Sequence, residues 1–597
     1  MKILSFLRAP LLFALISFAI GLSACQKDIS GDPGATDQAD LTTKVSASVS
    51  GFVTDENDQP VLGATVKVGT ITTFTDKYGY FQVGSSDVVK NAAVVTVSRN
   101  GYFKGIKTFI ATAGKDAFFR IKLLPKTAIG SFSGSTGGTV TSGTGLKIVF
   151  PANAIVVAAN GAAYTGTVQV SARRIDPVSN ELEKIMPGDL RGLDAAGSLK
   201  LLTSYGMLAA ELTGSGGESL QIATGKKATI TLDLDASILA TAPASIPLWY
   251  FNEANGLWTE EGTALKTGNT YVGEMSHFSY WNCDVPANYV HFSCTVKTST
   301  GAAVSHALVK VSSIANPNNR GFGYTDTAGY TTGAVPNNMA LKLEVFSSSN
   351  CGTAVYSQTF TTTNVNINLG TITIPVSTNF ALVSGTLTNC SGGPVTNGYL
   401  IVKENSQFHR FPVNSTGAFS FPYLLCSSSP VVTLIGEDQG TAQQSVPASF
   451  TLVAGANAIG NIQACGVSAQ QFFNMNINGT AYSFTTPADS IHHGFGSGTA
   501  ASMRVIAFRL NSNTPSETSL SFASAGVAVN SLQLMEYFRT AYIQDSMTIV
   551  NPISVRITEL GAIGEFISGN FTGTFRGAMP ANISYNVSAS FRTRRSN

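Results

Sequence analysis

Short stretches in which apolar and polar residues alternate recur along the whole chain. Ala64, Val66 and Val68 alternate with polar residues, and the same period of two runs from Ile583 to Phe591. Successive side chains of a β-strand point to opposite faces of a sheet, so this pattern predicts half-buried strands. Many such runs separated by Gly, Asn, Asp and Ser are typical of all-β domains. The best candidate for a short helix is the segment from Leu532 to Thr540.

One group of motifs occurs three times. In the first copy, a strand that begins near Val49 is followed by a turn from Asp55 to Pro60 and by a hairpin turn at Thr75-Asp76-x-x-Gly79. Asp and Asn side chains bond their own backbone in such turns, and glycine supplies a positive φ. The second copy begins near Phe292 and the third near Val383. The repeat predicts three sandwiches of immunoglobulin size.

The turns and strands of the first copy resemble the carboxypeptidase regulatory-like domain, a transthyretin-like β-sandwich. The resemblance covers about residues 46–125, and the two later copies show it with departures. In that family the domain is a folding and binding module and not the catalytic part. The resemblance therefore implies binding rather than catalysis.

A small polar cluster in the first copy has two interpretations. Asp55, Asn57 and Asp58 fit either a calcium loop or an Asx-rich turn. Calcium needs six or more oxygen ligands and usually a further bidentate carboxylate. We therefore favour the turn and predict no metal site.

The N-terminal residues form a separate segment. Lys2 and Arg8 accompany an apolar run from Leu11 to Leu22, which is shorter than the about 20 residues that span a bilayer. The run ends in Leu22-Ser23-Ala24-Cys25, and small residues before a cut are typical of a secretory signal. With cysteine after the cut, the segment resembles a bacterial lipoprotein signal. The resemblance implies a lipid on Cys25, and a plain secretory signal is the alternative.

The residues after Cys25 suggest where the protein is sent. Gln26-Lys27-Asp28 resembles the export signal of Bacteroidetes-type lipoproteins on the outer face of the outer membrane, with a generic polar spacer as the alternative. Residues 26–46 have almost no large apolar side chain, so they predict a flexible tether. We expect a protein that acyl chains attach to the outer membrane and that is displayed at the cell surface.

Residues 127–284 follow a different pattern. Gly137-Gly138-Thr139-Val140 and Phe150-Pro151-x-x-Ala154 resemble the β-sandwich of ankyrins and netrin receptors and the related region of cartilage intermediate layer proteins. His277-Phe278-Ser279 lies near the end of this module. In some relatives this triplet cleaves itself, because the serine hydroxyl attacks the preceding carbonyl while histidine takes its proton. The alternative, which we favour, is a plain strand with Phe278 pointing inward.

The cysteines favour an exported protein with disulfide bonds. The chain has seven cysteines, and Cys25 is assigned to the lipid. An even set confined to one region of an exported chain predicts disulfides, and the absence of Cys-x-x-Cys excludes a metal cluster of that type. Their pairing is open. The six candidates are Cys283, Cys294, Cys351, Cys390, Cys426 and Cys465.

Composition and charge reduce the number of function classes that fit this chain. The 597 residues are 44% hydrophobic and 12% charged, with a net charge of +2, and they suffice for about four or five domains. Apart from the terminal Arg592-Thr593-Arg594-Arg595 there is no basic block, so we expect no nucleic-acid partner. Motifs for a nucleophile elbow, a phosphate loop or a zinc protease are missing, and we expect no cofactor.

These observations favour a non-catalytic cell-surface lipoprotein whose β-sandwiches bind an extracellular protein or glycan. A self-cleaving or hydrolytic envelope enzyme and a structural envelope component are the alternatives. The predicted fold is all-β, with tandem antiparallel sandwiches of immunoglobulin or transthyretin type behind a lipoprotein signal. The C-terminal domain resembles an uncharacterised type in Bacteroidetes-type lipoproteins, which implies no activity. The predicted ranges are 1–24 (signal peptide), 25–45 (lipidated cysteine and tether), 46–126 (first copy), 127–284 (central module), 285–376 (second copy), 377–466 (third copy) and 467–597 (C-terminal domain).

Overall fold

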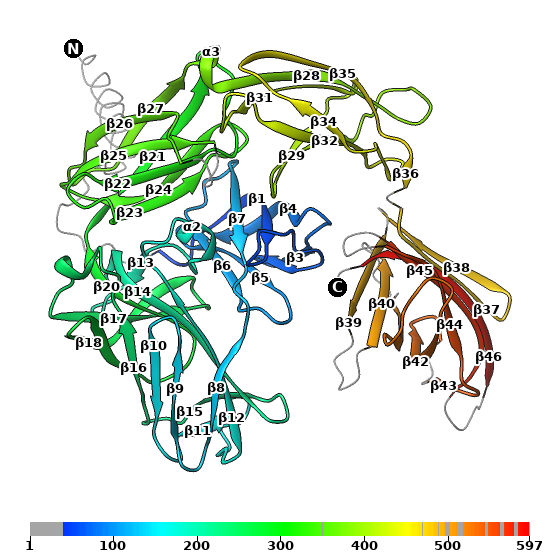
Figure 1. Ribbon diagram of the computed structural model, residues 1–597, viewed down its shortest axis with the longest axis horizontal. Coiled ribbons are helices and arrows are strands. Elements are labelled where there is room, and N and C mark those ends of the chain that lie inside the picture. The colour runs from blue at the N-terminus through cyan, green and yellow to red at the C-terminus, as the bar shows by residue number, and fades with distance from the viewer. Residues whose placement is uncertain are drawn as a thin grey trace, which may run out of the picture. The chain divides into compact units, whose positions relative to one another are not determined.

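The computed structural model describes residues 40–347, 352–468, 470–486, 489–495, 502–509, 517–543, 547–561, 566–577 and 583–595. The predicted signal peptide, Cys25 and most of the tether lie outside these residues. In the described part of the chain, no helix is long and apolar enough to cross a membrane. The prediction of an all-β fold built from antiparallel sheets is confirmed (Figure 1).

The first copy consists of two packed sheets. One has the strand order β4-β1-β7 and the other has the order β3-β2-β5-β6. The central strand β1 pairs antiparallel with β4 and parallel with β7. Val53, Val66 and Phe81 lie between the two sheets and are almost completely buried. The strands are β1 (Lys44–Thr54), β2 (Thr65–Val68), β3 (Ile71–Phe74), β4 (Tyr80–Val89), β5 (Ala93–Ser98), β6 (Gly105–Phe109) and β7 (Asp116–Lys122).

The second copy repeats this topology, as the repeated motifs predict. The third copy repeats the three-stranded sheet, and its other sheet has six strands. In the second copy β21 lies between antiparallel β24 and parallel β27, and in the third β28 lies between antiparallel β31 and parallel β35. The elements are β21 (Tyr289–Thr298), β22 (Leu308–Ser313), β23 (Arg320–Tyr324), β24 (Tyr330–Pro336), β25 (Ala340–Phe346), β26 (Tyr356–Thr361), β27 (Ile367–Ile374), α3 (Val376–Asn379), β28 (Phe380–Thr388), β29 (Gly398–Glu404), β30 (Gln407–Pro412), β31 (Ala418–Leu424), β32 (Val431–Asp438), β33 (Gln443–Gln444), β34 (Ala448–Thr451), β35 (Gly455–Gln463) and β36 (Val467–Ser468).

One hairpin turn has the same hydrogen bonds in all three copies. A side-chain oxygen accepts from the backbone N–H groups two and four residues later, and it belongs to Asp76, Asp326 or Asn414. In the first copy Gly79 has a φ of +71°, and a Cβ there would lie 2.2 Å from the carbonyl oxygen of Val53. Only glycine tolerates both conditions, so the predicted role of this glycine is confirmed.

The central module is one branched sheet of 13 strands with two apolar clusters. One cluster is internal and contains Ile148, Leu248 and Trp281. The other joins Trp249 and other residues of this module to Phe103 and Ile106 of the first copy. The elements are β8 (Ala128–Ser133), β9 (Gly138–Ser142), β10 (Leu146–Phe150), β11 (Ile155–Val157), β12 (Thr167–Ile175), α2 (Leu182–Ile185), β13 (Arg191–Leu193), β14 (Leu199–Gly214), β15 (Ser219–Ile222), β16 (Ala228–Asp233), η1 (Leu239–Thr241), β17 (Ser245–Asn252), β18 (Leu257–Thr267), β19 (Thr270–Met275) and β20 (Tyr280–Ala287).

The C-terminal module corrects one prediction. The segment expected to be a helix is strand β42, because Gln533, Met535 and Phe538 are buried while most of the residues between them are exposed. This alternation fits a sheet face, with a register shift in the pairing with β41. The strands form a 10-stranded sheet. They are β37 (Phe472–Ile477), β38 (Thr480–Thr485), β39 (Asp489–Phe495), β40 (Ser502–Arg509), β41 (Thr518–Ala523), β42 (Leu532–Thr540), β43 (Thr548–Ile549), β44 (Ser554–Leu560), β45 (Phe566–Arg576) and β46 (Ser584–Arg594).

Candidate functional site

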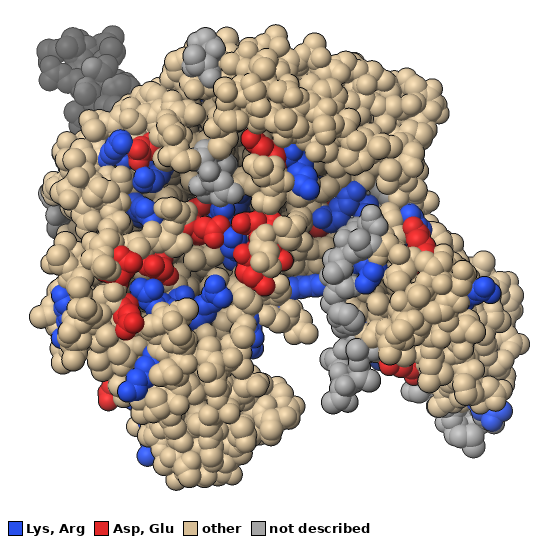
Figure 2. All heavy atoms as spheres, viewed as in Figure 1, with Lys and Arg blue, Asp and Glu red and all other residues tan. Residues whose placement is uncertain are grey.

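The first copy, the central module and the second copy meet around a cavity of about 210 Å³. Its walls come from β6 and β7, from α2 and the residues after it, and from β22, β23 and β24. Figure 2 shows acidic and basic side chains gathered in the middle of the visible face, whereas most of the visible surface of the third copy is uncharged. We call this space the junction cavity.

Lys107 is a deeply buried cation of the junction cavity. It lies on β6, only 4% of the residue is exposed, and its Nζ donates to the carbonyl oxygens of Glu183 and Met186, both at 2.7 Å. Burial lowers the pKa of Lys107 to about 7, and the negative charge of Glu183 opposes that shift. The ammonium is therefore near its titration midpoint at neutral pH.

Two arginines hold the neighbouring walls together. Arg320 of β23 donates through Nη2 to the carbonyl oxygens of Val178 and Ser179 at 2.8 and 2.9 Å. Arg191 is 1% exposed; its Nη1 donates to the carbonyl oxygen of Asn91 in the first copy at 2.6 Å, and its Nε donates to Asp189 at 2.8 Å. These contacts fix α2 and its flanking loops between the first and second copies.

A second polar cluster joins all three copies. The ring of Phe118 on β7 stacks on His306 of the second copy, with centroids 3.9 Å apart. Next to it, Arg120 donates to the carbonyl oxygen of Phe408 in the third copy at 3.1 Å, and its Nη2 lies 3.5 Å from Nδ1 of His409. Burial, together with the charge of Arg120, lowers the pKa of His306 to about 3 and also lowers that of His409. Both rings are therefore neutral at pH 7.

His277-Phe278-Ser279 does not form the predicted strand. It is a bend between β19 and β20, although Phe278 is buried as expected and stacks on Phe150. Gln221 explains the bend, because its side-chain amide bonds both the N–H and the carbonyl oxygen of Phe278 at 2.8 Å. The Gln221 side chain thus makes the hydrogen bonds to the Phe278 backbone that a neighbouring strand would otherwise make.

The side chains of His277 and Ser279 contact other residues and not each other. The Oγ of Ser279 donates to the carbonyl oxygen of Tyr280 at 3.1 Å. His277 packs against Tyr250 and Trp281, and its Nε2 lies 3.9 Å from a carboxylate oxygen of Glu261. Burial lowers the pKa of His277, and Glu261 opposes that shift. In this arrangement the Ser279 hydroxyl donates to a backbone carbonyl oxygen and not to the ring of His277, which would be the base in an acyl shift.

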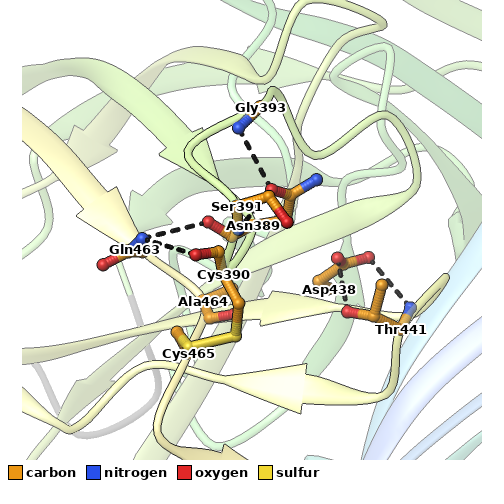
Figure 3. The surroundings of a disulfide bond; sticks show 9 residues. All are labelled: Asn389, Cys390, Ser391, Gly393, Asp438, Thr441, Gln463, Ala464 and Cys465. Atoms are coloured by element: carbon orange, nitrogen blue, oxygen red, sulfur yellow. Dashed lines mark hydrogen bonds between the residues drawn. A yellow bond between two sulfur atoms is a disulfide. The ribbon is translucent and has the colours of Figure 1, made fainter.

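The disulfide prediction is right for part of the cysteine set. Cys390 and Cys465 form a disulfide that ties the turn after β28 to the end of β35 (Figure 3). Near it, Gln463 donates to the carbonyl oxygens of Asn389 and Cys390. Cys426 is also disulfide-bonded, whereas Cys351 lies outside the described residues.

The prediction is wrong for Cys283 and Cys294, which are free buried thiols. Cys283 belongs to the core of the central module, and Cys294 belongs to the core of the second copy. The two side chains therefore lie in different apolar clusters and have no thiol to pair with there. Burial raises the pKa of both thiols, so they are small apolar core residues and not nucleophiles.

The Asx-turn interpretation of the polar cluster in the first copy is confirmed. The Oδ1 of Asp55 accepts from the backbone N–H groups of Asn57 and Gln59, both at 2.8 Å. Asp58 forms an ion pair with Lys122 at 2.9 Å. In the described part of the chain, no group of three His, Cys, Asp or Glu residues is arranged to hold a metal ion.

Sequence reasoning missed the junction cavity entirely. Lys107, Glu183 and Arg320 are far apart in the sequence and belong to three modules. The available signal was a charged residue inside an apolar strand, as at Lys107 and at Arg120 between Phe119 and Ile121. Such a residue is rarely buried without partners, but the pattern does not say which module supplies them.

No family model matches this chain. It is similar to mouse (Mus musculus) cartilage intermediate layer protein 2, with 26% identity over 226 residues, which is 36% of this chain and 19% of that protein. The human (Homo sapiens) protein shares 29% identity over 127 residues, which is 21% of this chain and 10% of that protein. The chain therefore matches about a fifth of the length of these relatives or less.

Several solved bacterial structures are also similar, at low scores. The shaft pilin SpaA of Lactobacillus rhamnosus GG has 8% identity and a TM-score of 0.17, covering 30% of this chain and 99% of the pilin. The TIE protein of Bacillus anthracis has 8% identity and a TM-score of 0.15, covering 64% of this chain and 69% of that protein. A streptococcal ancillary pilin has 9% identity and a TM-score of 0.14, covering 39% of this chain and 98% of the pilin. Scores this low carry no argument about function.

Proposed function

We propose that this chain is a non-catalytic scaffold that a lipid on Cys25 anchors to the outer membrane and that binds a protein or glycan outside the cell. The supporting observation is the way the first copy joins the other modules. It shares one apolar cluster with the central module and another, around Phe52 and Ile401, with the third copy. Modules packed in this way hold their loops in fixed positions, which suits recognition.

The anchor is tested with Cys25→Ala, and Ser30→Ala in the predicted tether is the matched control. We expect the Cys25→Ala protein to move from the membrane fraction to the soluble fraction, because its acyl chains are lost. The Ser30→Ala protein should stay with the membrane and be removed by protease added to intact cells. Membrane retention of Cys25→Ala would contradict the anchor.

Binding is tested with the purified full chain on arrays of extracellular proteins and glycans. We expect saturable binding to a small set of related targets. Failure to bind any of them above the level of an unrelated all-β protein would count against the scaffold.

Self-cleavage between Phe278 and Ser279 is the second candidate, and one contact favours it. Nε2 of Gln221 donates to the carbonyl oxygen of Phe278, where negative charge develops during attack on that carbonyl. The scaffold proposal expects a single full-length mass in denaturing mass spectrometry. Two fragments divided between Phe278 and Ser279 would overturn the scaffold proposal, provided that the Ser279→Ala protein shows a single full-length mass.

A further inference from the structure

We propose that the junction cavity binds a small organic acid with an aromatic or branched apolar body. This goes beyond the scaffold proposal and does not depend on it, because the cavity is lined by residues of three modules where they meet. Charge, hydrogen-bonding capacity and shape each point to this class of ligand.

The charges around the cavity favour an anion. Five basic and three acidic side chains line it, which leaves a formal excess of two positive charges when Lys107 is protonated. Two of the acids are already engaged, because Asp116 accepts from Thr327 at 2.7 Å and Asp189 accepts from Arg191 at 2.8 Å. The eight residues are Lys107, Lys115, Arg120, Arg191, Arg320, Asp116, Glu183 and Asp189.

Two cations of the cavity, Lys107 and Arg320, have N–H donors that a ligand could use. An ammonium group carries three N–H donors, and two bonds of Lys107 go to neutral carbonyl oxygens. Nε of Arg320 is buried and has no acceptor among the described residues. A buried donor without a partner is unfavourable. A carboxylate placed beside these groups would accept charge-assisted hydrogen bonds and offset the burial of the ammonium.

The rest of the lining suits an apolar body. It includes Leu182, Phe109, Phe119, Phe292, Phe322 and Val335. The volume of about 210 Å³ exceeds the roughly 150 Å³ of an apolar cavity that admits benzene. A ring with a short acidic side chain therefore fits, and 3-phenylpropionate is a suitable probe.

The test compares 3-phenylpropionate with the neutral 3-phenylpropan-1-ol by calorimetric titration of the full chain in detergent. We expect the acid to bind at least about tenfold more tightly, because a hydrogen bond to a charged group is worth that much. Lys107→Met should remove this preference, so that the acid no longer binds more tightly than the alcohol. Lys67→Met, at an exposed lysine on β2 of the same copy, should change neither affinity.

The unmodified chain gives a second test in case Lys107→Met does not fold. The affinity for the acid should fall as the pH rises from 6.5 to 8.5, because Lys107 loses its proton in this range, while the affinity for the alcohol stays constant. The arginines around the cavity keep their charge throughout. Equal affinities for acid and alcohol, a pH-independent affinity for the acid, or no binding of either compound would overturn the proposal.

Discussion

The first and third copies have equivalent three-stranded sheets, but the corresponding edge strand has different surroundings in each. In the first copy this strand is β7, which carries Asp116, Arg120 and Lys122 and is largely buried. Its charged side chains bond residues of other modules, such as Glu181 and the carbonyl oxygen of Phe408. In the third copy the strand is β35, which has no charged residue and is mostly exposed.

An unpaired strand edge invites pairing with another chain, and the two copies counter this in different ways. Neighbouring modules cover β7. By contrast, β35 has a register shift next to Gly460, whose φ is +80°, and a disulfide at its end. Bulges twist an edge away from a partner. The edge strand is therefore protected by docking in the first copy, and by a register shift and a disulfide in the third.

The largest expected effect comes from removing that covalent bond. Cys390 and Cys465 are 75 residues apart in the sequence, and closing such a loop stabilises the folded state by about 4.5 kcal/mol in the chain-entropy model. In Cys390→Ala/Cys465→Ala, hydrogen exchange should accelerate in β28 and β35 but not in β1 and β7. Ser391→Ala, an exposed change in the same turn, is the control. Equally accelerated hydrogen exchange in β1 and β7 of the first copy would refute the conclusion that the disulfide stabilises the third copy specifically.

Acid should weaken the docking of the first copy. The pKa of His306 is about 3 in the packed structure and about 6.5 when the ring is free, so its stabilising contribution is complete above pH 6.5 and is lost as the pH falls towards 3. At pH 5 the loss from His306 alone is about 2 kcal/mol. The charged groups near it are Arg120 and Asp116, and the neighbouring titratable group is His409, whose pKa shifts in the same direction.

The measurement is the radius of gyration of the full chain by small-angle scattering from pH 7.5 to pH 4. We expect an increase below pH 6 as the modules separate. His306→Asn tests the assignment, because Asn tolerates the φ of +60° found at this position and does not titrate. An unchanged pH profile in this variant would rule out His306 as the sensor.

The sequence predicts local features well and contacts between modules poorly. The turn at Asp76 and Gly79 was predictable because its hydrogen bonds lie within five residues. The strand at residues 532–540 was not, since Met535 and Phe538 are also spaced for one face of a helix. Whether Cys283 forms a disulfide and whether Lys107 is buried depend on which module packs against each strand. The periodicity of apolar residues along the sequence does not predict this packing between modules.

The smallest expected effect concerns one hydroxyl group that the third copy lacks. Oγ1 of Thr75 accepts from the N–H of Ala64 at 2.8 Å and donates to the carbonyl oxygen of Val61 at 2.5 Å. Thr325 makes the equivalent pair of bonds in the second copy, whereas Val413 occupies this position in the third. The disulfide-bonded copy therefore holds this turn without the hydroxyl.

Thr75→Val introduces the residue of the third copy into the first. It leaves a buried donor and a buried acceptor without partners, so we expect a loss of about 1–3 kcal/mol, seen as faster hydrogen exchange in β2 and β3. Thr72→Val, an exposed change on β3, should have little effect. If Thr75→Val is also neutral, the hydroxyl does not stabilise the first copy, and docking to the neighbouring modules suffices to hold the turn.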